Sequence, residues 1–256
     1  MFRAGRGHID DDVADFINAP CQMSLPIRAY TIAEVKAEIT RLKTCKAPGY
    51  DLITGQILKH LPYKTIALLA LLFNRILTLS YFPVLWKYAE IIMIPKPDKP
   101  SNGPTSYRPI SLLPKTSKLY ERLFLKRRSK EHDLSTLIPS QQFGFRERHS
   151  TIHQVHRIVN EIATSLEEKK YYNAVFLDIS QAFVRIWQPG LLYKLKHKLS
   201  SNYYLLLKSN LADTNFAVRH NNTLSDHHPI EAGVPQGNVL GPLTYLLHGA
   251  ESFLRS

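Results

Sequence analysis

Apolar residues recur along this chain at helical spacing, and the first clear pattern covers residues 31–45. Its apolar positions share one helical face and are Ile32, Val35, Ile39 and Leu42. Thr31 followed by Glu34 matches a capping box, in which each side chain satisfies a backbone amide of the other. The segment Lys46-Ala-Pro-Gly49 contains helix breakers. The sequence therefore predicts a helix that begins at Thr31 and ends before Lys46.

Further helices are predicted wherever the same spacing returns. They cover residues 63–80, 114–131, 150–170, 189–199, 203–211 and 243–254. In the first of these, one stripe contains Leu68, Leu72, Ile76 and Leu79. In residues 150–170, Ser150 is a plausible N-cap and one face contains Ile152, Val155, Val159, Ile162 and Leu166.

Strands are predicted where β-branched and aromatic residues lie between turn residues. Residues 88–96 and 107–113 are expected to pair as a hairpin with basic residues at its tip. Residues 215–219 and 227–231 flank His220-Asn-Asn222, which is a turn signal. Residues 174–177 are apolar without a break, as in a strand that is buried on both faces. Helices mixed with short strands indicate an α+β fold.

Two regions are expected along the chain. Residues 1–30 contain Gly, Pro and the acidic cluster Asp10-Asp-Asp12 without strong periodicity, which indicates a loosely attached lead-in. Residues 31–256 carry the periodic segments and are expected to form one domain.

Composition narrows the possible partners. The chain has 256 residues and a formal net charge of +12, which favours a polyanion such as nucleic acid over an acidic membrane surface. Its two cysteines show no zinc spacing and indicate a reducing compartment. The N-terminus lacks a signal peptide, and the longest apolar run, residues 66–73, is far shorter than the about 20 residues that span a bilayer. We expect an intracellular protein that makes no membrane contact, nuclear or cytoplasmic.

One carboxylate follows the apolar run 174–177 directly, and it is Asp178. A carboxylate at the end of a buried strand needs a partner, and Mg²⁺ takes carboxylate oxygens together with substrate phosphates. Asp is also a favoured N-cap residue, and Ser-Gln-Ala-Phe follows here. From this stretch alone, a metal ligand and a helix cap both remain open.

Basic residues dominate the predicted helix 114–131. From residue 114 to residue 130, one acidic residue, Glu121, stands against seven basic ones, which are Lys115, Lys118, Arg122, Lys126, Arg127, Arg128 and Lys130. Such a run forms either a solvated face or a phosphate-binding surface. Lys126-Arg-Arg128 also has the composition of a short nuclear signal.

Two glycine-containing segments complete the candidate chemistry. In Gln142-Phe-Gly-Phe145-Arg146, an aromatic ring beside an arginine can stack on a base and bind a phosphate, or the aromatic residues can belong to the core. Gly233-Val-Pro-Gln236-Gly237-Asn-Val-Leu-Gly-Pro allows the backbone to approach a ligand closely, or forms an ordinary loop.

In chain order, these segments resemble the reverse transcriptase domain of non-LTR (LINE-type) retrotransposons. The matching segments are Lys46-Ala-Pro-Gly-Tyr-Asp51, Phe82-Pro-Val-Leu-Trp86-Lys, Ile94-Pro-Lys96-Pro, Ser106-Tyr-Arg108-Pro-Ile-Ser-Leu-Leu, Ser117-Lys-Leu-Tyr-Glu121, Gln141-Gln-Phe-Gly-Phe-Arg146, Phe176-Leu-Asp178-Ile-Ser-Gln-Ala-Phe183 and Gly233-Val-Pro-Gln236-Gly237. The resemblance implies a right-hand polymerase fold with a small antiparallel sheet, of which this chain would contain the fingers and an incomplete palm, with the thumb absent.

The resemblance also implies roles for individual residues. Asp178 would be the first metal-binding aspartate, and the Ile179 backbone carbonyl would contact the second Mg²⁺. Residues expected to contact the incoming dNTP are Lys96, Arg108, Gln236, Gly237 and Phe183, the last as the steric gate against a ribose 2′-hydroxyl unless it is a core residue. Residues expected to contact the RNA template and DNA primer are Lys115, Lys118, Arg122, Phe145 and Arg146.

The chain departs from the family pattern in one important respect. The family carries a second acidic block, aromatic-Ala-Asp-Asp, and no such block follows Gln236 here. Because two metals need several anionic oxygens, we expect a catalytically incomplete RNA-directed DNA polymerase. A non-catalytic fragment that binds RNA or DNA is the alternative, and a remnant that does not fold stably is the third possibility.

Overall fold

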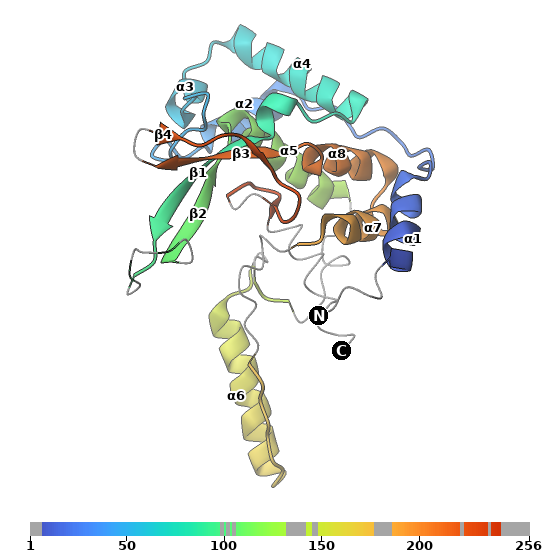
Figure 1. The fold of residues 1–256 in the computed structure, drawn as a ribbon, viewed down its shortest axis with the longest axis vertical. Coiled ribbons are helices and arrows are strands. Elements are labelled where there is room, and N and C mark those ends of the chain that lie inside the picture. The colour runs from blue at the N-terminus through green and yellow to red at the C-terminus, as the bar shows by residue number, and fades with distance from the viewer. Residues whose placement is uncertain are drawn as a thin grey trace.

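The structure is a computed structural model that describes residues 7–97, 100, 103, 106–131, 142–144, 148–176, 186–220, 223–234 and 237–241. Figure 1 shows a small sheet packed against helices, with α6 extending away from both. The helices are α1 (Gly7–Asn18), α2 (Ile32–Thr40), α3 (Gly55–Lys59), α4 (Tyr63–Leu79), α5 (Lys115–Glu131), α6 (Thr151–Glu167), α7 (Gln188–Lys198) and α8 (Ser201–Leu211), with the 3-10 turn η1 (Val84–Trp86). The strands are β1 (Tyr88–Pro95), β2 (Tyr107–Leu112), β3 (Asn215–His220), β4 (Thr223–Leu224) and β5 (His228–Pro229). This is an α+β fold, as the sequence predicts.

The described strands form one five-stranded sheet in the order β2-β1-β3-β4, with β5 paired to β3. β1 and β2 are antiparallel, as the predicted hairpin requires, but β1 and β3 run parallel. The sheet is therefore mixed, with one parallel pair in place of the small antiparallel sheet that the family resemblance implies. The reason lies in the connection, because the chain between β2 and β3 passes through helices and returns in the direction of β1.

Pro109 lies inside β2 without breaking the hairpin. Among the described strands β2 has β1 as its neighbour on one side and none on the other. A proline lacks the amide that a central strand would need, so an edge position accommodates it.

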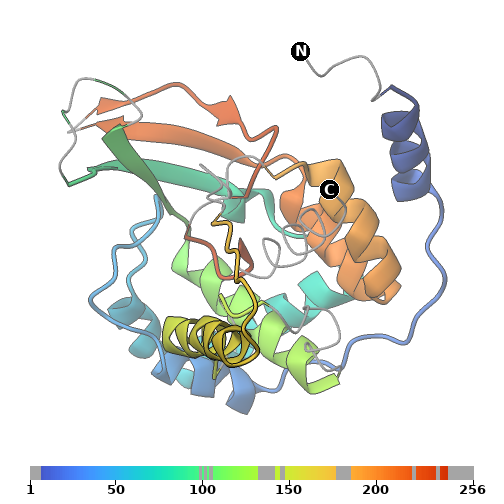
Figure 2. The ribbon, with the colours of Figure 1, turned by 90° about the horizontal axis from the view of Figure 1, so that it is seen from below.

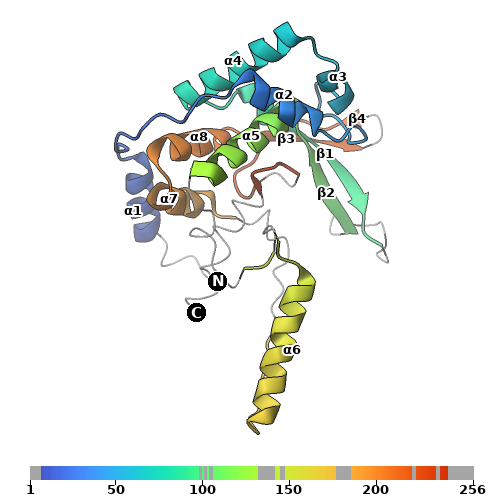
Figure 3. The ribbon, with the colours of Figure 1, turned by 180° about the vertical axis from the view of Figure 1, so that it is seen from behind.

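The largest described core surrounds α5, which lies between α2 and α8 (Figure 3). Figure 2 shows the sheet on one side of these helices. Tyr120 is 1% exposed and sits among the rings of Tyr30, Phe73 and Phe82. Aromatic rings of this size contribute most of the apolar area that a core of this kind removes from water.

Two predicted helix starts are confirmed at the level of hydrogen bonds. Thr31 and Glu34 form the capping box of α2, and the Ser150 side chain accepts from the His153 amide at the start of α6. The side of α4 that faces the core differs from the predicted stripe. Of the predicted residues Ile76 is buried, but Leu68 and Leu79 are 65% and 69% exposed. The core side of α4 instead contains Ile66, Ala70, Phe73, Ile76 and Leu77.

Part of the expected loose lead-in is ordered. Residues 7–18 form α1, and Val13 and Ile17 are buried in its contact with α7. The Lys196 ammonium donates to the Phe16 and Ala19 carbonyls at 2.6 Å each, which ties the end of α1 to α7.

The apolar segment before Asp178 does not form the expected strand in its described part. Residues 171–176 have no regular structure, and Val175 and Phe176 are 83% and 82% exposed. The prediction of a doubly buried strand fails there because the described sheet offers this segment no neighbouring strand. The apolar face of α6 is also exposed, and the predicted helix 243–254 lies outside the described residues.

Cys21 and Cys45 are free thiols, consistent with the absence of a disulfide framework in the sequence. None of the helices in the described ranges is both long and apolar enough to cross a membrane.

Candidate nucleotide and nucleic-acid interface

The tip of the β1–β2 hairpin brings Lys96 and Arg108 together. Ile94 on β1 is paired with Arg108 on β2, and the Lys96 amide donates to the Ser106 carbonyl at 2.8 Å. Paired residues on antiparallel strands project from the same face, and a residue two positions further along a strand shares that face. The hairpin therefore places both cationic residues at the end where β1 leads into β2.

The glycine-rich loop lies against the other end of β2. Gly237 has a φ of +123°, and a Cβ there would lie 2.8 Å from the Ser111 carbonyl oxygen. Both facts require glycine, because a side chain would be strained and would collide with the strand. Ser111 is three positions from Arg108, which is about 10 Å along a strand. The loop and the hairpin tip therefore share β2.

Glu121 connects the same loop to α5. One carboxylate oxygen accepts from the Val239 amide at 2.7 Å and from the Leu240 amide at 3.1 Å, and the other accepts from the Ser117 hydroxyl at 3.1 Å. The residue is 1% exposed, and burial raises the pKa of its carboxyl while these hydrogen bonds oppose that rise. This role of Glu121 could not be predicted from the basic helix alone, since its partners in the loop lie 118 and 119 residues away.

A cluster of cations occupies the N-terminal half of α5, and we call Lys46, Lys115, Lys118 and Arg122 the cation cluster. Burial lowers the pKa of the Lys115 ammonium, and the charges of Lys118, Arg122 and Lys46 lower it further. Burial also lowers the pKa of Lys118, which Glu121 opposes and Arg122 reinforces. Within the described residues, none of the four makes an ion pair.

Lys46 joins this cluster through the backbone. A Cβ at Gly49 would lie 2.6 Å from the backbone nitrogen of Pro114, so the segment from Lys46 to Gly49 lies directly against the start of α5. From the sequence, this segment was predicted only to end a helix and to match a family motif. Its glycine was the available signal for such a close approach.

The position of these cations on the helix is unfavourable by itself. The first turn of α5 contains no acidic residue, and the N-terminal end of a helix carries a partial positive charge that repels lysine. A bound phosphate removes both sources of repulsion, because helix N-termini and lysines each attract anions. The arrangement thus fits a polyanion better than it fits the empty protein.

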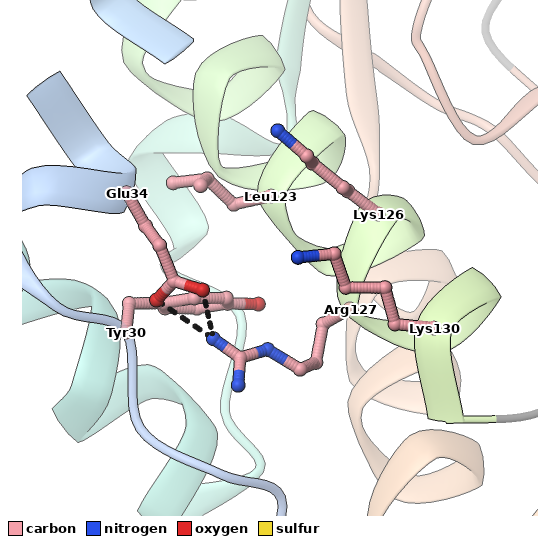
Figure 4. Close-up of a pocket in the computed structure, with 6 residues that line it drawn as sticks. All are labelled: Tyr30, Glu34, Leu123, Lys126, Arg127 and Lys130. Carbon is pink, nitrogen blue, oxygen red and sulfur yellow. Dashed lines mark hydrogen bonds and ion pairs between the residues drawn. The ribbon is translucent and has the colours of Figure 1, made fainter. Parts of the chain in front are cut away.

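In the C-terminal half of α5, unlike the N-terminal half, basic side chains form ion pairs with acidic residues of α2. Arg127 donates to both Glu34 oxygens at 2.9 and 2.8 Å, and Lys126 reaches Glu38 at 2.7 Å. The Arg128 guanidinium lies 5.6 Å from the centre of the Tyr203 ring. Figure 4 shows Arg127 and Glu34 beside Tyr30 in a pocket of about 40 Å³, which has room for a few waters and none for a nucleotide.

Several predicted site residues lie outside the described residues. They are Phe145, Arg146, Asp178, Ile179, Phe183 and Gln236. The described segments next to Phe183 and Gln236 nevertheless contact each other. The Gly233 amide donates to the Ile186 carbonyl at 2.8 Å, and the Gln188 side chain donates to the Gly233 carbonyl at 2.9 Å. The chain that follows Phe183 is therefore joined to the start of the glycine-rich loop. Among the described residues, no group of three or more His, Cys, Asp or Glu side chains could bind a metal ion.

Comparison with known proteins decides the family. A family model described as "Reverse transcriptase (RNA-dependent DNA polymerase)" matches residues 94–253. This chain belongs to the reverse transcriptase family. The matched range includes the hairpin tip, α5 and the glycine-rich loop, so the interface described above lies within the family domain.

Curated relatives narrow the kind of reverse transcriptase. The chain is 46% identical over 238 residues to a probable RNA-directed DNA polymerase from transposon X-element of Drosophila melanogaster, covering 93% of this chain and 26% of that protein. It is 46% identical over 239 residues to the RNA-directed DNA polymerase from mobile element jockey of the same species, with coverage of 93% and 26%. The "Putative 115 kDa protein in type-1 retrotransposable element R1DM" is 29% identical over 221 residues, covering 85% of this chain and 21% of that protein. The chain thus corresponds to a reverse transcriptase domain of non-LTR retrotransposons and spans about a quarter of the length of these relatives.

Proposed function

We propose that this chain is the part of an RNA-directed DNA polymerase that binds a primer–template and the incoming deoxynucleoside triphosphate. The single observation that carries the proposal is the cation cluster, most of which lies on α5. The glycine-rich loop contacts both α5 and β2, and β2 leads to the hairpin tip. The relatives named as RNA-directed DNA polymerases support the same assignment.

In this proposal the hairpin tip binds the triphosphate. Lys96 and Arg108 supply positive charge, and Arg108 can bind two phosphate oxygens with its planar guanidinium. The loop around Gln236 and Gly237 packs against the nucleotide, and its glycine permits the close approach of the backbone. Phe183, in the role of steric gate, excludes a ribose 2′-hydroxyl.

The cation cluster binds the phosphate backbone of the primer–template. Lys115, Lys118 and Arg122 form salt-sensitive contacts that are independent of base sequence. Phe145 and Arg146 contact the RNA template by stacking and by a charge-assisted hydrogen bond.

Catalysis by a chain of this family would use Mg²⁺ at Asp178, together with the backbone carbonyl of Ile179. When bound, such ions activate the primer 3′-oxygen and neutralise the triphosphate. What the described residues contribute is the binding and alignment of both substrates.

Primer extension tests this function. The purified chain would receive an RNA template, a DNA primer, Mg²⁺ and all four dNTPs, with Asp178→Ala as the matched control. Extension that disappears in the control supports a polymerase whose metal site is completed by another acidic residue. Extension that survives in Asp178→Ala contradicts the role given to this aspartate.

A second function, binding without catalysis, is favoured by the cation cluster, because phosphate contacts through lysine and arginine side chains need no metal-binding carboxylate. Absence of extension together with salt-sensitive binding of the primer–template would support this non-catalytic function. Absence of both would overturn the two proposals together, and a broad unfolding transition would then indicate a chain that does not fold stably.

A further inference from the structure

Glu121 is a buried carboxylate whose partners are neutral donors. None of the described lysine, arginine or histidine nitrogens lies within ion-pair distance of it. Placing a carboxylate inside a protein is costly, and an apolar residue of similar size would fill the same volume more cheaply. The residue therefore has a task beyond filling the core, and its hydrogen bonds identify that task.

Those hydrogen bonds go to backbone amides of the glycine-rich loop. The Asn238 side chain accepts from the Gly241 amide at 2.6 Å, three residues ahead, which is the N-cap pattern. Val239 and Leu240 lie between them. Glu121 accepts from both of their amides, so the amides of residues 239–241 are satisfied partly by Asn238 and partly by a side chain of α5.

The loop is consequently fixed at two neighbouring points. Gly237 lies against the Ser111 backbone on β2, and Val239 with Leu240 is bound to α5. β2 also carries Arg108, and α5 also carries the cation cluster. Glu121 therefore sets the distance between the glycine-rich loop and the cations that bind phosphates in the proposed function.

The two tasks use different sides of α5. Ser117 and Glu121 are four residues apart and share the side that faces the loop. Lys118 and Arg122 are each one residue further along, which turns them by about 100° around the helix. A change at Glu121 can thus release the loop and leave the phosphate-binding cations in place, although it also removes the charge that attracts Lys118.

We infer that Glu121 is a positioning residue, which holds the loop 237–241 in the conformation that accepts the nucleoside triphosphate. The inference rests on the proposed function, since it concerns the same nucleotide site. Loss of the Glu121 acceptor should weaken nucleotide binding, while binding of the primer–template should remain.

Two substitutions separate this role from a general effect on folding. Glu121→Leu removes the acceptor and leaves the two amides without a partner. Glu121→Gln keeps one carbonyl oxygen for the amides and an amide group that can donate to the Ser117 hydroxyl. Glu38→Leu is the matched control, because Glu38 is a buried carboxylate that binds the other half of α5 through Lys126.

The experiment measures amide hydrogen exchange at Val239 and Leu240, together with two affinities. The probes are an RNA template annealed to a dideoxy-terminated DNA primer, and dATP with Mg²⁺ bound to that complex. For Glu121→Leu we expect about tenfold faster exchange and about tenfold weaker dATP binding, because this substitution removes a hydrogen bond to a charged group. Primer–template affinity should stay within about twofold, and Glu121→Gln should restore both loop properties.

Other results would overturn the inference. Unchanged exchange and dATP affinity in Glu121→Leu would show that the carboxylate does not hold the loop. Equal losses of dATP and primer–template affinity, matched by Glu38→Leu, would show a merely structural role. If the unchanged chain binds the primer–template but no dATP, the nucleotide-binding part of the proposed function is wrong, and this inference is wrong with it. Amide exchange would still show separately whether Glu121 fixes the loop.

Discussion

The two halves of α5 are both rich in basic residues but differ in the charges around them. In the C-terminal half, Arg127 and Lys126 are neutralised by Glu34 and Glu38 of α2. In the N-terminal half, Lys115, Lys118 and Arg122 repel one another and are joined by Lys46. A count of basic residues treats the whole helix as one surface. The comparison teaches that the charges available to a nucleic acid are those that no acid of the protein already neutralises.

Arg127→Ala should produce the largest effect, which is a loss of stability without a loss of nucleic-acid affinity. Arg127 is 6% exposed, so its removal leaves Glu34 without its partner in a half-buried position. We expect a loss of about 2 kcal/mol in the free energy of unfolding, measured by urea denaturation. Affinity for the primer–template should be unchanged. A large loss of affinity at full stability would show that this half also binds nucleic acid.

The double substitution Lys118→Gln and Arg122→Gln should instead reduce primer–template affinity and leave stability intact. Primer–template affinity should fall about tenfold, which is about 1.4 kcal/mol. The slope of log affinity against log salt should decrease by about 0.9 for each phosphate that the chain no longer neutralises. Stability should change little, because the attraction of Lys118 to Glu121 and its repulsion by Arg122 are removed together. An unchanged salt slope would contradict the assignment of the cation cluster.

Glu121→Gln should change how stability depends on pH. Burial raises the pKa of this carboxyl above its ordinary value of 4.5, so the folded chain binds the proton more tightly than the unfolded chain. The stability contributed by this group is therefore fully present below pH 4.5 and is lost as pH rises through the folded pKa. Relative to the unchanged chain, Glu121→Gln should gain stability across that window. Parallel stability curves across the window would contradict the raised pKa.

Lys126→Gln should have the smallest effect. Its side chain is 41% exposed, and ion pairs near the surface contribute on the order of 0.5 kcal/mol or less. Primer–template binding should not change, which makes this variant the matched control for the substitution of Lys118 and Arg122. If Lys126→Gln lost as much primer–template affinity as the double substitution of Lys118 and Arg122, the claim that the two halves of α5 have different roles would be wrong.

Local signals in the sequence predicted the local structure well. The capping box at Thr31, the N-cap at Ser150 and the β1–β2 hairpin are each determined by residues close together in the chain, and each is confirmed. The family and its fold class could also be predicted, because the motifs occur in a fixed order.

The failures concern contacts between distant segments. The parallel pairing of β1 with β3, the acids that neutralise half of α5 and the role of Glu121 all join residues far apart in sequence. Periodicity shows that α4 has an apolar side, but α4 has apolar residues on two sides, and the spacing does not distinguish the buried one. The roles of Asp178, Ile179, Phe183, Gln236, Phe145 and Arg146 stay predictions.

The pairing of β1 with β3 also constrains how the protein can form during synthesis. Glu90 and its partner Arg219 are 129 residues apart, so β3 is made on the order of ten seconds after β1 at ordinary translation rates. Throughout that interval β1 has no β3 to pair with, so its second edge is open to other chains. The charge of Glu90 on that edge opposes premature association until Arg219 arrives to neutralise it.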